Sequence, residues 1–178
     1  MRTLSQAEID QYRTDGYVRL PGFFSREEIA PMQTACHADP TLSGALMALA
    51  DSLGNAQELV LYTELSNDLV GVIPRLEHVV MAAEALLGGS PYHWHSKLSM
   101  KQPASDGTWD WHQDYGYWYH QGVLRPDMLT VAIAVDENTA EKGCMSVVKG
   151  SHLLGRIEHG RKGEATGVDQ ARLEQVLE

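Results

Sequence analysis

The hydrophobic period of the sequence changes near Pro91, and this change limits the fold more than any other feature. Between positions 92 and 101, apolar and polar residues alternate, as they do in a strand with one apolar face. Before Pro91, apolar residues instead follow the three- and four-residue spacing of one buried helix face. They are Leu76, Val79, Val80, Ala83, Leu86 and Leu87. Helices followed by short strands are typical of α+β folds with a sandwich or barrel core.

Short sequence signals predict where the helices begin and end. Residues 5–8 and 25–28 read as capping boxes, in which a serine hydroxyl and a glutamate carboxylate satisfy free N–H groups of a first helical turn. The first of these helices is expected to end at Gly16. Pro31 lies inside the second and is expected to kink or interrupt it. Pro74 is expected to open a third helix, because proline is favoured in a first turn.

Residue type and alternation predict the remaining elements. Strands are expected at 17–20, 92–101, 108–114, 128–136 and 144–149. The glycine-rich polar residues 158–169 are expected to form a loop, and residues 170–178 the start of a helix. The length suits a single domain over residues 1–178, mainly helical in 1–90 and β in 91–178.

The composition argues against several classes of protein. A net charge of −10 disfavours a nucleic-acid-binding surface, which needs clustered positive charge, and docking on an anionic membrane. No apolar run reaches the roughly eighteen residues of a membrane span, and the N-terminus lacks the apolar stretch of a secretory signal. Two cysteines, Cys36 and Cys144, are too few for a disulfide framework, so a cytoplasmic protein is expected.

The stretch WDWHQDYGYWYH, residues 109–120, carries the clearest chemical signal. In His112-Gln113-Asp114 the outer side chains are spaced i, i+2, which places them on one face of an extended segment. They could supply two of the three ligands of a 2-His-1-carboxylate iron site, which leaves positions open for a co-substrate and dioxygen. The alternative is an aromatic core strand in which Asp114 only accepts a hydrogen bond. An unpartnered buried aspartate would be costly, which favours a metal or another cation.

Five segments together resemble the phytanoyl-CoA dioxygenase family of Fe(II)/2-oxoglutarate oxygenases, which includes the ectoine hydroxylases. They are GYVRLPGFFS, HSKLSMKQP, WHQDYGYW, LTVAIAVDENT and GCMSVVKGSH. The resemblance implies a double-stranded β-helix, a cupin-like jelly roll, with about half of its core strands within residues 91–178. It also implies hydroxylation of a small-molecule substrate with Fe²⁺, 2-oxoglutarate and dioxygen, and ascorbate as a reductant.

The resemblance implies roles for individual residues as well. His112 and Asp114 match two of the three iron ligands. Three residues match positions that hold or line 2-oxoglutarate: His95, Lys97 and Gln113. Three aromatic residues are expected at the lip of the substrate pocket: Tyr117, Trp118 and Tyr119. The alternatives are core packing for these aromatic residues and ordinary solvent-facing strand positions for His95 and Lys97.

The family's third ligand, a distal histidine with an arginine further on that pairs with 2-oxoglutarate, has no match. His152 belongs to a Gly-Ser-His turn, and His159 follows Asp114 too soon to lie on a returning strand. The chain is therefore expected to be the N-terminal part of a longer oxygenase. The 178 residues alone are expected to bind iron weakly and to show no turnover.

Two other functions stay open. A degenerate or truncated relative could bind a metal or ligand without catalysis. The other is a cupin-type metal enzyme, which uses no 2-oxoglutarate and has its metal ligands close together in the sequence. A similarly close group here consists of Asp110, His112, Asp114 and His120. The family-like segments on both sides favour the oxygenase. The aromatic lip favours a partly apolar or cationic substrate.

Overall fold

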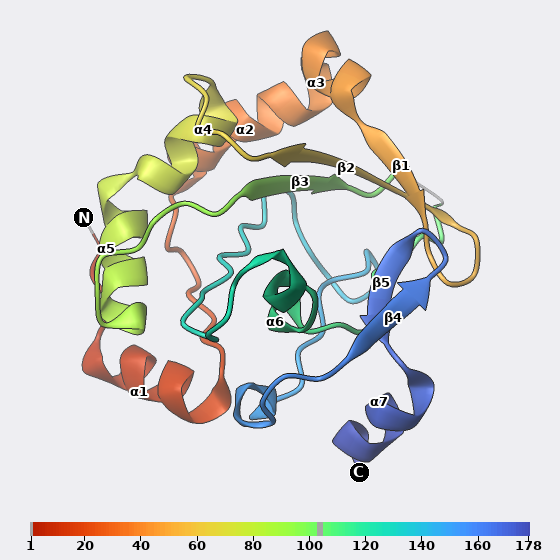
Figure 1. Cartoon of the computed structure of the whole chain (residues 1–178). Helices are drawn as coiled ribbons and strands as arrows, with labels where there is room; N and C mark the ends of the chain where they lie inside the picture. The colour runs from red at the N-terminus through yellow and green to blue at the C-terminus, as the bar shows by residue number, and fades with distance from the viewer. Residues whose placement is uncertain (1, 103–104) are drawn as a thin grey trace. The chain divides into compact units, whose positions relative to one another are not determined.

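The computed structural model (Figure 1) describes residues 2–102 and 105–178. The chain divides into two compact units. Unit 1 consists of three stretches: the chain up to Leu46, Val60–Leu98 and Leu129–Met145. Unit 2 consists of Met47–Leu59, Ser99–Met128 and Ser146–Glu178. The His112-Gln113-Asp114 segment therefore belongs to unit 2. Pro103, the last residue of the HSKLSMKQP segment, lies outside the described residues.

Both predicted capping boxes begin helices in unit 1. Helix α1 (Gln6–Asp15) follows Ser5, whose hydroxyl accepts a hydrogen bond from the Glu8 N–H while the Glu8 carboxylate accepts one from the Ser5 N–H. Gly16 ends this helix, as predicted, with a φ of 81°, which glycine adopts without strain. Ser25 caps helix α2 (Arg26–Ala38) in the same way.

Pro31 does not interrupt α2, which continues without a break to Ala38. Met32 and Cys36, four residues apart and on one face of the helix, are both buried. Packing of this face outweighs the backbone hydrogen bond that a proline removes. The short helix α3 (Pro40–Ala45) follows, with Asp39 as its N-cap.

Three further helical elements complete unit 1: α4 (Leu69–Val72), the 3₁₀ turn η1 (Ile73–Arg75) and α5 (Glu77–Leu87). The helix predicted to open at Pro74 thus begins as a 3₁₀ turn, and α5 ends at Gly88, whose φ is 73°. Val79 of α5 is buried, as the helical spacing predicts. Within residues 2–102 and 105–178, no helix has the length and apolar character of a membrane span.

Two antiparallel hairpins and a fifth strand contribute residues to unit 2. Strand β1 (Met47–Ala50) pairs with β2 (Ala56–Tyr62), and β4 (His159–Lys162) pairs with β5 (Ala165–Val168). Strand β3 (Ser96–Met100) lies next to β2 in the sheet order β1-β2-β3 (Figure 1). Both β2 and β3 also extend into stretches assigned to unit 1. The helical elements of unit 2 are α6 (Asp114–Trp118), η2 (Tyr119–Gln121), η3 (Ser151–Leu153) and α7 (Gln170–Leu177).

The α+β class is correct, but several predicted elements are not. The described residues form no strand at 17–20, 108–114, 128–136 or 144–149, and the strand expected at 92–101 is limited to β3. Alternation favours a strand only where a neighbour completes the ladder of hydrogen bonds, and the described residues form no ladder there. The loop predicted at 158–169 is instead the β4–β5 hairpin, in which Gly163 turns the chain with a φ of 62°.

Asp51, at the turn between β1 and β2, connects this hairpin to the segment that carries His112. The residue is only 1% exposed. Its carboxylate accepts hydrogen bonds from the backbone N–H groups of Leu53, Asn55 and Thr108, at 2.9, 2.7 and 3.1 Å. Burial by itself would raise the pKa of Asp51, but these donors hold that pKa below its usual value.

Replacing Asp51 with asparagine should destabilise the protein at neutral pH, because the amide loses the charge that strengthens these bonds. The carboxylate contribution is complete above the unfolded-state pKa of about 3.9 and disappears as the pH falls through the lower folded-state pKa. We therefore expect Asp51→Asn to lower the thermal midpoint by several degrees at neutral pH, and the difference to shrink in acid.

Thermal unfolding followed by circular dichroism between neutral and acidic pH measures both effects. The matched control is Asp106→Asn, which makes the same change of charge at an exposed residue two positions before Thr108. Equal losses of stability in the two variants would contradict the role assigned to Asp51.

Candidate metal centre

His112 and Asp114 lie side by side although the segment is not a strand. Gln113 between them has φ −120° and ψ 120°, an extended conformation, so its two neighbours project to the same side. Asp114 then begins α6. The His112 Nε2 atom lies 3.4 Å from the Asp114 Oδ1 atom, and the two side chains are 25% and 26% exposed. The pair is half-buried and still open to solvent.

The backbone determines which nitrogen of His112 faces Asp114. The Nδ1 atom lies 2.7 Å from the carbonyl oxygen of Asp110. A carbonyl only accepts hydrogen bonds, so Nδ1 carries the proton, and in the neutral ring the lone pair is on Nε2. A lone pair and a carboxylate oxygen that face each other at 3.4 Å need a cation or a proton between them.

This arrangement fits a metal ion. Two ligands at right angles, each about 2.1 Å from one ion, lie about 3 Å apart, close to the observed separation. A metal-binding histidine typically donates its other N–H to a carbonyl or carboxylate, as His112 does to Asp110. Among the described residues, no three histidine, cysteine, aspartate or glutamate side chains are grouped as a metal site. The structure therefore brings the two predicted ligands together and, among the described residues, groups no third candidate with them.

Asp110 is itself held by the β1–β2 hairpin. Its carboxylate accepts hydrogen bonds from the hydroxyl and the backbone N–H of Ser52, at 2.6 and 3.1 Å. His120, another residue of the cupin-like cluster, instead contacts Glu158 at 3.2 Å. The side chains of Asp110 and His120 therefore contact other residues instead of the His112–Asp114 pair.

Tyr117 contacts both members of the pair. Its hydroxyl donates to Asp114 Oδ1 at 2.7 Å, and the centroid of its ring lies 5.9 Å from that of His112. Burial of the phenol, and then the negative charge of Asp114 and the hydrogen bond to it, raise the pKa of Tyr117 above its usual value. The hydroxyl is therefore a protonated donor to the carboxylate at neutral pH.

The segment before and within β4 holds Gln113 in its extended conformation. The Gln113 side-chain amide donates to the Gly155 carbonyl at 2.8 Å and accepts from the Ile157 N–H at 2.9 Å. The Gln113 backbone N–H donates to His159 Nε2 at 2.7 Å, and His159 Nδ1 donates to the Ile157 carbonyl at 2.7 Å. Because both ring nitrogens of His159 are engaged with the backbone, His159 does not act as a third ligand here.

Two further observations agree with a neutral His159 ring that makes hydrogen bonds to the backbone. Burial, opposed by the hydrogen bond to Ile157, lowers the pKa of the His159 ring below its usual value. The ring also packs so closely on Gly116 that a Cβ atom there would lie 2.0 Å from His159 Cε1. Glycine at position 116 is therefore what allows α6 to approach β4.

The other predicted site residues have the following places. Lys97 is an exposed residue of β3, and His95 is half-buried just before that strand; both belong to unit 1. Trp118 lies in α6, where its ring packs edge-on against Tyr117. Tyr119 begins η2, and the guanidinium carbon of Arg156 lies 4.5 Å from its ring centroid. The cofactor and substrate contacts expected of these residues stay predictions.

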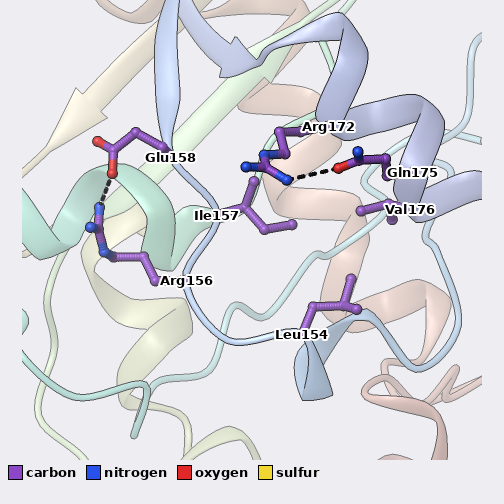
Figure 2. A pocket seen from close by; sticks show the side chains of 7 residues that line it. All are labelled: Leu154, Arg156, Ile157, Glu158, Arg172, Gln175 and Val176. Carbon is purple, nitrogen blue, oxygen red and sulfur yellow. Dashed lines mark hydrogen bonds and ion pairs between the residues drawn. The ribbon is translucent and has the colours of Figure 1, made fainter.

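A pocket of about 430 Å³ (Figure 2) is lined by Leu154, Arg156, Ile157 and Glu158 and by three residues of α7, Arg172, Gln175 and Val176. Its two arginines are already engaged, Arg156 with Glu158 and Arg172 with Gln175. His112 and Asp114 do not line this pocket, although the pocket includes Ile157, which contacts Gln113.

Known proteins resemble this chain over most of its length. The sequence profile of the family described as phytanoyl-CoA dioxygenase (PhyH) matches residues 12–174. An L-proline trans-4-hydroxylase of Streptomyces griseoviridis is 38% identical over 110 residues, which cover 58% of this chain and 41% of the relative. An ectoine dioxygenase of Bordetella parapertussis is 25% identical, with 84% of this chain and 50% of the relative covered.

A probable alpha-ketoglutarate-dependent hypophosphite dioxygenase of Stutzerimonas stutzeri is 28% identical over 80% of this chain and 51% of its own length. The chain thus spans about half the length of the curated relatives that it matches. The profile match includes the His112-Gln113-Asp114 segment and nearly all of both units. The chain therefore belongs to the phytanoyl-CoA dioxygenase family.

Proposed function

We propose that His112 and Asp114 are two iron ligands of an Fe(II)/2-oxoglutarate-dependent oxygenase that hydroxylates a small molecule. The observation that carries the proposal is the geometry of the pair. His112 Nε2 faces Asp114 Oδ1 at 3.4 Å, and the Asp110 carbonyl retains the proton on Nδ1. Family membership supports the same chemistry, because the similar proteins are named as dioxygenases and a hydroxylase.

In this proposal the residues of the chain position and orient the two iron ligands. Iron with bound 2-oxoglutarate supplies the oxidising chemistry when it is present. His112 offers one neutral nitrogen, and Asp114 offers a negative charge at the first position of α6, where the helix dipole favours it. The bonds from Gln113 to Gly155, Ile157 and His159 keep the two ligands on one side of the chain.

The proposal extends to the fold of the core and to the residues that contact 2-oxoglutarate and the substrate. The core is proposed to be a double-stranded β-helix, with β3 among its strands. His95, Lys97 and Gln113 are proposed to contact 2-oxoglutarate; for Gln113 this contact would have to coexist with the two bonds that its side-chain amide makes. Trp118 and Tyr119 are proposed to contact the substrate. The relatives are named for ectoine, L-proline and hypophosphite, and we extend only the class, a small polar molecule, to this chain.

The cupin-type alternative is less well supported. It requires Asp110 or His120 near the pair, but their side chains contact Ser52 and Glu158 instead. The second alternative is metal binding without catalysis. It is favoured because the described residues group no third candidate ligand with the pair. Catalytic turnover of 2-oxoglutarate would favour the oxygenase over this alternative, whereas its absence in this chain is expected of both.

Removing either ligand should weaken metal binding, because one remaining ligand cannot chelate an ion. We expect His112→Ala and Asp114→Ala each to lower the affinity for Fe²⁺, measured anaerobically by calorimetry, by at least about tenfold. The matched control is His37→Ala. His37 also faces an aspartate, Asp136, at 3.0 Å, but on the surface of unit 1. Loss of binding in the control, or retention in both ligand variants, would contradict the assignment.

The 178-residue chain by itself should bind Fe²⁺ weakly and should not convert 2-oxoglutarate, because two protein ligands leave the ion loosely held. Succinate release can be followed with Fe²⁺, 2-oxoglutarate, ascorbate and L-proline or ectoine as trial substrates. Catalytic succinate release that disappears in Asp114→Ala would establish the oxygenase and refute the prediction that a third ligand is missing.

A further inference from the structure

We propose that Tyr117 is a positioning residue for Asp114, whose hydroxyl fixes the carboxylate in the orientation that faces His112. The inference rests on the metal-binding role proposed for the pair. It gives Tyr117 a different function from the substrate contact that the sequence predicts, because its hydroxyl is directed at a ligand.

The hydrogen bond and the ligand geometry converge on a single oxygen atom. Tyr117 donates to Asp114 Oδ1 at 2.7 Å, and the same Oδ1 is the atom 3.4 Å from His112 Nε2. A carboxylate oxygen has two lone pairs, so it can accept the phenol proton on one and bind a cation with the other. Rotation of the carboxylate away from His112 would break the bond to Tyr117.

The spacing explains why this bond forms. Asp114 and Tyr117 are three residues apart in α6, and side chains at i and i+3 of a helix are neighbours. On the strand predicted at 108–114, a continuation to Tyr117 would have placed the two side chains on opposite faces. The positioning contact is therefore a consequence of the helix beginning at Asp114.

The tyrosine ring is fixed on three sides. Its centroid lies 5.9 Å from His112, 5.5 Å from Trp118 and 6.0 Å from His159, the last two in edge-on arrangements. His159 is in turn held by backbone bonds to Gln113 and Ile157. A ring with so little freedom holds its hydroxyl in one place, which is the property a positioning residue needs.

Tyr117→Phe separates positioning from substrate contact, because it keeps the ring and removes only the donor. The probe is Co²⁺, titrated into the full chain without 2-oxoglutarate or substrate. Binding is followed by the cobalt absorption bands and by broadening of the His112 ring resonances, which also detects weak affinity. Loss of a partner that orients a ligand typically lowers metal affinity about 10–100-fold, and we expect a loss in this range with altered cobalt bands.

The matched control is Tyr115→Phe in the same helix. Its hydroxyl donates to the Leu124 carbonyl at 3.1 Å and does not contact a proposed ligand. We expect this variant to bind Co²⁺ like the wild type. Equal affinities and spectra for wild type, Tyr117→Phe and Tyr115→Phe would overturn the inference and leave the proposed function standing. A folded wild type that does not bind Co²⁺ would overturn both.

A measurement on the metal-free wild type tests the same inference even if Tyr117→Phe is poorly folded. Three-bond couplings report the χ1 rotamer of Asp114. A single rotamer supports positioning by Tyr117, particularly if Tyr117→Phe shows rotamer averaging. Averaging in the wild type would show that the hydroxyl does not fix the carboxylate and would overturn the inference.

Discussion

The hydrogen bond between His112 Nδ1 and the Asp110 carbonyl is the interaction on which the proposed site depends. It assigns the proton to one ring nitrogen and leaves the other to face Asp114. The carbonyl is held in place because the Asp110 side chain is bonded to Ser52 and because Thr108 is bonded to Asp51. The β1–β2 turn therefore holds the carbonyl that His112, one of the two proposed ligands, contacts.

A second set of contacts orients Asp114, the other proposed ligand. Residues 155–159 hold Gln113 extended through its side-chain amide and its backbone N–H, and α6 begins immediately afterwards. Tyr117 then contacts Asp114 from within that helix. The two proposed ligands, two residues apart in one short segment, are thus oriented by parts of unit 2 that are distant in sequence. This is the usual relation between metal ligands and the groups that orient them.

Local signals predicted the structure well, and long-range ones did not. The capping boxes at Ser5 and Ser25 act within one helical turn, so sequence alone identified α1 and α2. The pairing of His112 and Asp114 needed only one extended residue, and it is present although the predicted strand is not. The strands expected at 128–136 and 144–149 depend on partners that alternation cannot specify, and the described residues form none there.

The functional contacts that the sequence missed have the same explanation. Ser52 and Asp110 are 58 residues apart, and Gln113 and His159 are 46 apart, so no spacing rule connects them. Tyr117 was within reach of a rule, because Asp114 and Tyr117 have the i, i+3 spacing of a helix. This contact was not predicted because the i, i+3 rule applies to a helix, and a strand was expected over residues 108–114. The β4–β5 hairpin was not predicted because its glycines indicated a loop; instead Gly160 and Gly167 pair within the strands, and Gly163 forms the turn.

Nitrogen NMR of the imidazole measures whether His112 binds a metal through Nε2 beside Asp114. A long-range ¹H–¹⁵N spectrum of the chain, recorded with and without Zn²⁺, separates the two ring nitrogens of His112. If Nε2 is the ligand atom, as proposed, Nδ1 should stay protonated, Nε2 should take the shift of a coordinated nitrogen, and the Asp114 carboxyl carbon should shift as well. A His112 ring that is unchanged at saturating Zn²⁺, or that binds through Nδ1, would contradict the proposed coordination.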